Sequence, residues 1–306
     1  MNKMNCTRKR TKGGAVKFLS IAILLLMSIG NAFGQVSLYA FAQSSGSYTA
    51  ISGGTNIAST HAAMLDDNTG SALPIGFTFN YNGTSYTTFG YNANGWINLG
   101  STAPTSSTTA ISTGSTNNVI SALNADLIGR GTLTINRTSG SPTVTVTAGD
   151  INLISVGDAV EGTGLVTGAT VVSKTATTVT LSSNASSNGT GSQLRFLNSS
   201  TGVRYETIGT SPNRTLVVQW TGFTRYNTTT AFGELYNFQI RLSEGTNAIS
   251  TVYNILGPNS TTTNTYQIGL RGASSSDYNN RTTTTNWAST TAGGSNSASC
   301  TISNTV

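Results

Sequence analysis

The chain has 306 residues, of which 37% are hydrophobic and 8% are charged, and its formal net charge is +6. The first 34 residues carry six of the sixteen Lys and Arg residues and none of the ten acidic ones, so the rest of the chain is neutral overall. Because nucleic-acid binding needs clustered basic residues and the remaining arginines are scattered, we expect no nucleic-acid partner.

The first 34 residues have the three parts of a secretory signal peptide. Six basic residues precede an apolar stretch, Phe18 to Ile29, and the small-x-small sequence Ala32-Phe33-Gly34 follows it. As a helix the apolar stretch would span only about 18 Å, less than the ~30 Å hydrocarbon core of a bilayer. We therefore expect cleavage near Gly34-Gln35, a secreted or cell-surface location, and no membrane insertion of the mature chain.

Composition and periodicity predict an all-β protein. The chain after the leader is rich in Thr, Ser, Asn and Gly, and no window shows a sustained 3.6-residue apolar period. Thr215 to Trp220 and Tyr236 to Leu242 alternate apolar and polar residues with period two, as half-buried antiparallel strands do. Asn82-Gly83 predicts a type I′ hairpin turn, because both central residues of that turn need positive φ. Asn94-Gly95 predicts a second such corner.

Eleven strands are expected along the chain, separated by turns that contain Gly or Asn. They are Ser37 to Phe41, Ser47 to Ile51, Ile75 to Tyr81, Ser85 to Tyr91, Gly95 to Leu99, Val119 to Leu123, Val203 to Thr207, Thr215 to Trp220, Leu235 to Leu242, Ala248 to Tyr253 and Tyr266 to Arg271. Strands at this spacing predict two packed antiparallel sheets, a jelly-roll-like sandwich.

The segment from Gly131 to Asn198 differs in amino-acid composition from its flanks. It has no Tyr or Trp, repeats short Val/Thr/Leu runs and carries glycine every few residues. We interpret it as a small all-β domain inserted in a surface loop, since lengthening a loop costs little closure entropy. The alternative is a long hairpin of the host sheet. The predicted organisation is a signal peptide over 1–34, a discontinuous sandwich over 35–130 and 199–306, and an inserted domain over 131–198.

Several short motifs lie along the host segments. They are Leu73-Pro74-Ile75-Gly76-Phe77-Thr78-Phe79 with Tyr81-Asn82-Gly83, Asn94-Gly95-Trp96-Ile97, Asn124-Ala125-Asp126-Leu127, Pro212-Asn213-Arg214 with Val218-Gln219-Trp220, Phe238-Gln239-Ile240-Arg241-Leu242, and Ile268-Gly269-Leu270-Arg271-Gly272. Together they resemble a module at the front of large bacterial surface proteins that are exported by type IX secretion. The inserted segment is similar to a glycine-rich β unit of bacterial and phage surface proteins.

The resemblance implies an extracellular module that is followed by fibronectin type III or similar repeats and a C-terminal sorting domain. It implies no catalytic residue. This sequence shows no such repeats, and Cys300 is the only cysteine left after removal of the leader. Exported proteins usually pair their thiols, so we expect the chain to be an N-terminal fragment that continues beyond Val306.

Candidate catalytic groups are few. His61 is the only histidine, and a Ser-His-Asp triad would need it to converge with an aspartate and with a serine on a constrained turn, but no G-x-S-x-G elbow occurs. A glycosidase needs two carboxylates on one face of a cleft, and of the host glutamates only Glu206 lies in an expected strand. We therefore expect no enzyme activity.

A metal site has one weak candidate. Asp66-Asp67-Asn68 offers oxygen ligands that would suit Ca²⁺, although the twelve-residue calcium loop with its terminal glutamate is absent. A solvated turn is the simpler interpretation, and no other cofactor is expected.

Polar residues on alternate strand positions predict an outer sheet face. Gln219, Gln239 and Arg241 lie on the polar faces of their strands, and Arg204 shares a face with Glu206. We expect these side chains to form a solvated patch, in which Arg204 and Glu206 make a weak exposed pair.

Aromatic side chains are the candidates for ligand binding. Trp220 shares the apolar face of its strand, so we expect it in the core. Trp96 follows a turn, and Phe223, Tyr226 and Phe232 lie in the loop expected after Trp220, where they could form an exposed aromatic edge. Two functions stay open: a non-catalytic module for adhesion, interaction or spacing in a larger extracellular protein, and a carbohydrate-binding module attached to a secreted enzyme. The partner would be an extracellular glycan or a surface protein.

Overall fold

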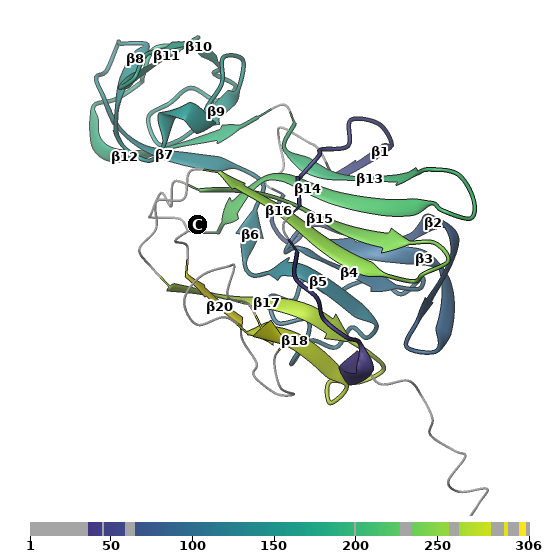
Figure 1. Ribbon diagram of the computed structural model, residues 1–306. Coiled ribbons are helices and arrows are strands. Elements are labelled where there is room, and N and C mark those ends of the chain that lie inside the picture. Colours follow the sequence, from purple (N-terminus) through teal and green to yellow (C-terminus); the bar gives the residue numbers. More distant parts are fainter. Residues whose placement is uncertain are drawn as a thin grey trace, which may run out of the picture. The chain divides into compact units, whose positions relative to one another are not determined.

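The computed structural model describes residues 36–44, 46–58, 65–198, 200–226, 234–256, 263–282, 291–292 and 300–303. The described residues form twenty strands and two short 3₁₀ turns, η1 (Val36–Leu38) and η2 (Ile151–Leu153) (Figure 1). The predicted all-β fold class is confirmed. The expected signal peptide lies outside the described residues.

The first sheet contains the antiparallel meander that the sequence predicts. Its order is β1-β13-β14-β15-β16, and β6 pairs with the end of β14. Its strands are β1 (Thr55–Ala58), β6 (Leu127–Ile128), β13 (Gly202–Ile208), β14 (Thr215–Arg225), β15 (Leu235–Ser243) and β16 (Ile249–Leu256).

The second sheet has eight strands in the order β19-β18-β17-β5-β4-β3-β2, and β20 pairs with β17. Its strands are β2 (Thr69–Tyr81), β3 (Thr84–Asn92), β4 (Trp96–Leu99), β5 (Val119–Asn124), β17 (Thr263–Arg271), β18 (Tyr278–Thr282), β19 (Thr291–Ala292) and β20 (Cys300–Ser303). Apolar side chains from both sheets form one buried cluster. Within it Trp220 stacks on Phe238 with ring centroids 5.1 Å apart, so Trp220 lies in the core as expected.

The two predicted corners differ in backbone geometry. Asn82 and Gly83 have φ of 52° and 76°, so both central residues of the β2–β3 hairpin take the left-handed conformation that a type I′ turn needs. In the β3–β4 connection only Gly95 has positive φ, at 87°, and its amide donates to the carbonyl of Asn92. The prediction of a second type I′ turn is therefore wrong, and the extra residue makes a three-residue loop.

Residues 131–197 form a third, six-stranded sheet in the order β10-β11-β8-β7-β12-β9. Its strands are β7 (Gly131–Arg137), β8 (Thr143–Ala148), β9 (Ala159–Glu161), β10 (Val171–Lys174), β11 (Thr178–Leu181) and β12 (Gly189–Leu197). A bridge between Ala159 and Thr170 joins the two ends of this order, so the sheet closes on itself as a small barrel. The barrel has its own apolar core, to which β15 of the sandwich adds Leu235.

The barrel strands that join the sandwich run side by side, because Gly131 of β7 pairs with Phe196 of β12. The domain boundaries at 131 and 198 stay a prediction that deletion can test.

Two expected strands are wrong. Val36 to Leu38 form η1, and residues 47–53 belong to no strand. Residues 47–53, here called the strap, lie on the outer face of the first sheet and are held there by side chains instead of a strand ladder. Within the strap only Tyr48 and Ile51 are partly buried, so its strand-like sequence reflects packing on the sheet without strand pairing.

Candidate functional site

The outer face of the first sheet is covered by the strap. The side-chain amide of Gln239 donates to the Gln219 side-chain oxygen at 2.7 Å and to the Thr49 carbonyl at 2.8 Å. The Ile51 amide donates to the same Gln219 oxygen at 2.9 Å. Both glutamines are therefore buried, and the expectation of a solvated face is wrong at these positions, because a distant segment supplies their partners.

A groove of about 370 Å³ lies beside the strap. Its walls come from the strap, from η2 and the residues after it, from the connection between the barrel and β13, and from β14, β15 and β16. Its lining residues are Tyr48, Ala50, Asn152, Leu153, Ser155, Asn198, Ser200, Thr221, Gly222, Leu235, Asn237, Asn254 and Leu256. No lining residue is charged, and most carry amide or hydroxyl groups.

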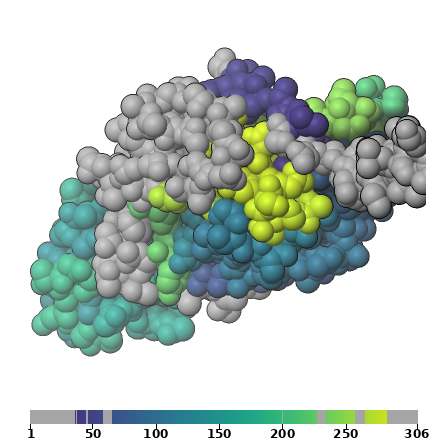
Figure 2. Space-filling model, turned by 90° about the horizontal axis from the view of Figure 1, so that it is seen from below, coloured from purple at the N-terminus to yellow at the C-terminus, as the bar shows by residue number. Residues whose placement is uncertain are grey.

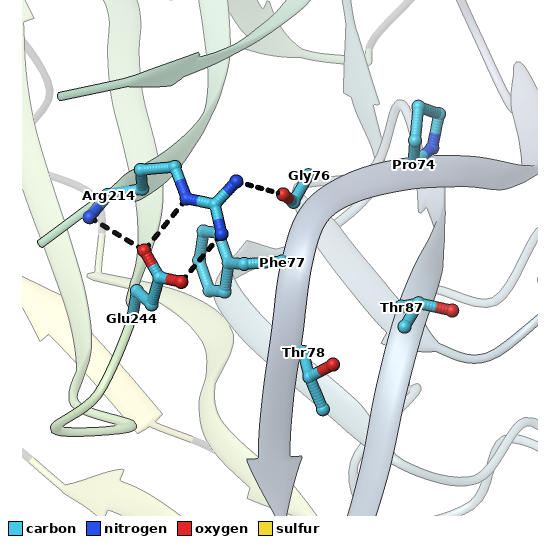
Figure 3. A pocket seen from close by; sticks show the side chains of 7 residues that line it. All are labelled: Pro74, Gly76, Phe77, Thr78, Thr87, Arg214 and Glu244. Atoms are coloured by element: carbon cyan, nitrogen blue, oxygen red, sulfur yellow. Dashed lines mark hydrogen bonds and ion pairs between the residues drawn. The ribbon is translucent and has the colours of Figure 1, made fainter. Parts of the chain in front are cut away.

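A second surface hollow, of about 510 Å³, lies where β2 meets the ends of β14 and β15. Figure 3 shows Arg214 and Glu244 directly paired in its lining, with Phe77 beside the guanidinium. Arg214 donates from Nη2 to one Glu244 oxygen at 2.6 Å, from Nε to the other at 2.8 Å, and from Nη1 to the Gly76 carbonyl at 2.7 Å. The hydrogen bonds from Arg214 lower the pKa of Glu244 to about 2, and Glu244 in turn raises the pKa of Arg214.

A buried ion pair that the sequence analysis did not identify lies at the other end of these strands. Arg225 donates from Nη2 to Glu234 Oε1 at 2.6 Å, and the Tyr236 hydroxyl donates to the same oxygen at 2.9 Å. The Tyr236 and Tyr266 hydroxyl groups lie 2.7 Å apart. Burial raises the pKa of Glu234, although Arg225 opposes this shift. Sequence spacing gave no signal for this pair, since its partners lie nine positions apart along the chain.

Trp96 is fully buried, so it cannot stack on a ligand. Its indole nitrogen donates to the Ser107 carbonyl at 3.0 Å, which holds residues 100–118 against the second sheet. Arg271 of β17 also holds this segment, because it donates a hydrogen bond to the Ala110 carbonyl at 3.2 Å. In Figure 2 the yellow atoms of the β17–β18 region lie directly beside this blue-teal segment.

Phe223 is also fully buried, and the expectation that it lies on an exposed loop is wrong. Strand β14 does not end at Trp220 but continues through a register irregularity to Arg225, which turns Phe223 into the core opposite Tyr236. Tyr226 is 36% exposed, and its amide donates to the Asp126 carbonyl. Phe232 and His61 lie outside the described residues.

The residues of the proposed calcium site are used in local structure. Asn94 donates to Asp67 at 2.8 Å, and the Tyr91 hydroxyl donates to Asn68 at 2.5 Å. Partial burial, with the nearby charges of Asp67 and Asp126, raises the pKa of Asp66. Across the described ranges, no group of three or more His, Cys, Asp or Glu side chains is placed to hold a metal ion, and the calcium hypothesis stays a prediction.

Glu206 of β13, the acid considered for glycosidase chemistry, faces the strap. A Cβ atom added to Gly53 would lie 2.6 Å from Glu206 Oε1, so the two approach closely. Arg204 does not pair with Glu206 in the structure but donates to the Ser52 and Gly53 carbonyls at 2.8 and 2.9 Å. Strand alternation thus placed both residues on one face, but it could not show that strap carbonyls accept the hydrogen bonds of the Arg204 guanidinium.

Comparisons with known proteins identify the family. The family model described as NIDO related matches residues 38–149 and 159–306, and the break falls within the barrel. No curated protein and no solved structure matches the chain significantly. Within the part of the chain that the structure describes, no helix has the length and apolar character to span a membrane. The match extends over most of the sequence, so the chain belongs to the NIDO-related family, a family of nidogen-like, β-rich extracellular modules.

Proposed function

We propose that this chain is a non-catalytic module for adhesion, interaction or spacing in a larger extracellular protein. The family match and the all-β fold support an extracellular module. The motif resemblance supports the finer proposal that the protein is exported by type IX secretion and acts at a bacterial cell surface.

The Arg214–Glu244 pair is the observation that carries the non-catalytic proposal. The larger surface hollow holds one acid and one base, and each neutralises the other through two hydrogen bonds. General acid–base catalysis needs a group whose pKa lies near the working pH. Glu244, with a pKa of about 2, is ionised at neutral pH, and Arg214 stays protonated, so neither can exchange a proton with a substrate.

Carbohydrate binding is a second candidate function. The neutral groove favours it, whereas the burial of Trp96 and Phe223 argues against the aromatic edge that the sequence suggested.

Turnover assays test the proposal. The mature chain from Gln35 onward should release no product from neutral polysaccharides, aryl esters or peptides, and the Glu206→Gln and Glu234→Gln variants should match it. Turnover that disappears in either variant, but survives in Asn56→Ala on the surface of β1, would overturn the proposal.

Adhesion has its own measurement. The immobilised mature chain should retain extracellular glycans or surface proteins in biolayer interferometry and release them unchanged, as mass spectrometry of the eluate would show. Failure to retain either kind of ligand would leave spacing as the role.

A further inference from the structure

We propose that the groove beside the strap binds a neutral glycan, with the side chains of β15, β16 and η2 as its hydrogen-bonding walls. The proposal rests on the non-catalytic function and deepens it, because it names the class of ligand that the module would hold.

The chemistry of the lining matches a sugar without charged groups. Asn152, Asn198, Asn237 and Asn254 bring four side-chain amides to one groove. The Asn198 and Asn237 oxygens already accept from the Ser200 and Gly222 amides, so these two side chains chiefly offer NH₂ donors, whereas Asn152 and Asn254 can both donate and accept. Sugar hydroxyl groups also donate and accept, so an amide array can satisfy several of them at once. No lysine or arginine lines the groove to pair with a carboxylate, sulfate or phosphate, which disfavours acidic glycans.

Both walls are held in place by hydrogen bonds that the lining residues make within the protein. On the sandwich side, Asn237 accepts from the Gly222 amide at 2.9 Å, which fixes its side-chain oxygen and leaves its NH₂ group as a donor. On the barrel side, Asp150 caps η2 by accepting from the Asn152 amide at 2.9 Å, and Asp158 accepts from the Ser155 amide at 2.8 Å. A site that is already formed loses less entropy on binding.

Apolar surface accompanies these polar groups. Leu153, Leu235 and Leu256 line the same groove, and Leu256 is 39% exposed although it ends a strand of the sheet. The half-buried ring of Tyr48 adds aromatic surface from the strap. Sugar rings present C–H faces between their hydroxyl groups, so a groove of mixed leucine, tyrosine and amide surface complements both parts of the ligand.

The size of the groove limits the ligand. At about 370 Å³ it lies near the lower end of small-molecule sites, which run from about 300 to 1,000 Å³. We therefore expect one or two sugar rings to occupy it, with the rest of a longer chain in solvent. An extended peptide would also use amides and could pair with β16, the edge strand of the first sheet that lines the groove, so peptide binding is the competing outcome that the titration must separate from glycan binding.

Calorimetric titration of the mature chain tests the proposal. The probes are cello-, malto-, laminari-, xylo-, manno- and chito-oligosaccharides of six units, with oligogalacturonate as the acidic glycan and an uncharged Ser/Asn-rich peptide as the peptide control. At least one neutral oligosaccharide should bind, and oligogalacturonate and the peptide should not.

The variants locate the site. Asn254→Ala and Asn152→Ala change opposite walls at exposed positions, and each should weaken binding about five- to tenfold, the effect of one lost hydrogen bond. Asn254→Trp should abolish binding by filling the groove. Asn56→Ala is the matched control, because Asn56 is an exposed asparagine on β1, a strand of the same sheet outside the groove. Circular dichroism and unfolding curves should match those of the parent in all four variants.

Four outcomes would overturn the glycan site: no neutral oligosaccharide binds, binding survives Asn254→Trp, Asn56→Ala weakens it equally, or only the acidic glycan or the peptide binds. In each case the protein could still lack turnover, so the non-catalytic proposal would stand. Cleavage of a bound oligosaccharide would instead refute the non-catalytic function while leaving the groove assigned.

Discussion

The side-chain amide of Gln239 donates a hydrogen bond to the side-chain oxygen of Gln219 at 2.7 Å, and both residues are buried beneath the strap. The pair joins β14 to β15 on the outer face of the sheet and also holds the strap at Thr49 and Ile51. The strap contributes Tyr48 and Ala50 to the groove, so this contact links the packing of an N-terminal segment to the shape of a candidate binding site.

Gln239→Leu should release the strap. The substitution leaves the Arg241 guanidinium and the Thr49 carbonyl without the partner they have now, and each orphaned group costs about 1–3 kcal/mol. We expect the free energy of unfolding to fall by about 2 kcal/mol or more in urea titration and the strap to become sensitive to limited proteolysis. Asn56→Ala should change neither property, and an unaltered cleavage pattern in Gln239→Leu would contradict this account.

Glu244 should stabilise the fold except at low pH. Its pKa is about 2 in the folded chain and 4.5 by default, so the folded state binds fewer protons between these values. The contribution is complete above pH 4.5 and disappears as the pH falls towards 2. The free energy of unfolding, measured from pH 2 to 6, should therefore rise more steeply with pH for the parent than for Glu244→Gln. An equal pH dependence of the two free energies would show that Arg214 does not lower the pKa of Glu244 in solution.

Glu234 should have the opposite effect. Because burial raises its pKa above the ordinary 4.5, the folded state binds more protons as the pH rises past that value. The stability associated with protonated Glu234 is therefore fully present below pH 4.5 and is lost as the pH rises through the folded pKa. The free energy of unfolding of the parent should therefore fall relative to that of Glu234→Gln as the pH rises above 4.5. A parent that gains stability relative to Glu234→Gln above pH 4.5 would show that the ion pair with Arg225 outweighs burial.

Gly95 should not tolerate alanine. Its φ is 87°, and an added Cβ atom would lie 2.7 Å from the Leu123 carbonyl oxygen. We expect Gly95→Ala to lower the free energy of unfolding by about 3 kcal/mol, the sum of left-handed strain and a backbone clash. Gly140 is the matched control, with φ of 79° and open space around its Cβ position, so Gly140→Ala should cost only about 1 kcal/mol. Equal losses of unfolding free energy in the two variants would mean that the backbone moves to relieve the clash with the Leu123 carbonyl oxygen.

The barrel should be removable. A short Gly/Ser bridge in place of residues 131–198 joins two neighbouring ends, because Gly131 and Phe196 are strand partners. The deletion exposes Leu235 and removes the Glu161 partner of Arg130, 2.7 Å away, so we expect a cooperative host fold that is about 2–4 kcal/mol less stable in urea. A host that no longer unfolds in one transition would show that the barrel supplies essential core.

Several features of the fold could be predicted from the sequence because they depend on local rules. Period-two alternation placed nine of the expected strands on strands of the structure, and it assigned Trp220 to the core because strand neighbours two apart share a face. Asn82-Gly83 predicted its turn because few other dipeptides accept positive φ twice.

Contacts between distant segments were decided only by the tertiary structure. Alternation showed that Gln219 and Gln239 lie on a polar face, but only folding brings Thr49 and Ile51 onto them and buries that face. Phe223 followed a turn-like Thr-Gly pair, yet pairing with β15 extends β14 past it. The groove likewise combines residues from 48 to 256, each an ordinary polar or apolar residue in its own segment. Local sequence determines the preferred backbone conformation and the face of the strand on which each side chain lies. A binding surface depends on which of these faces pack together, and that is a property of the folded chain.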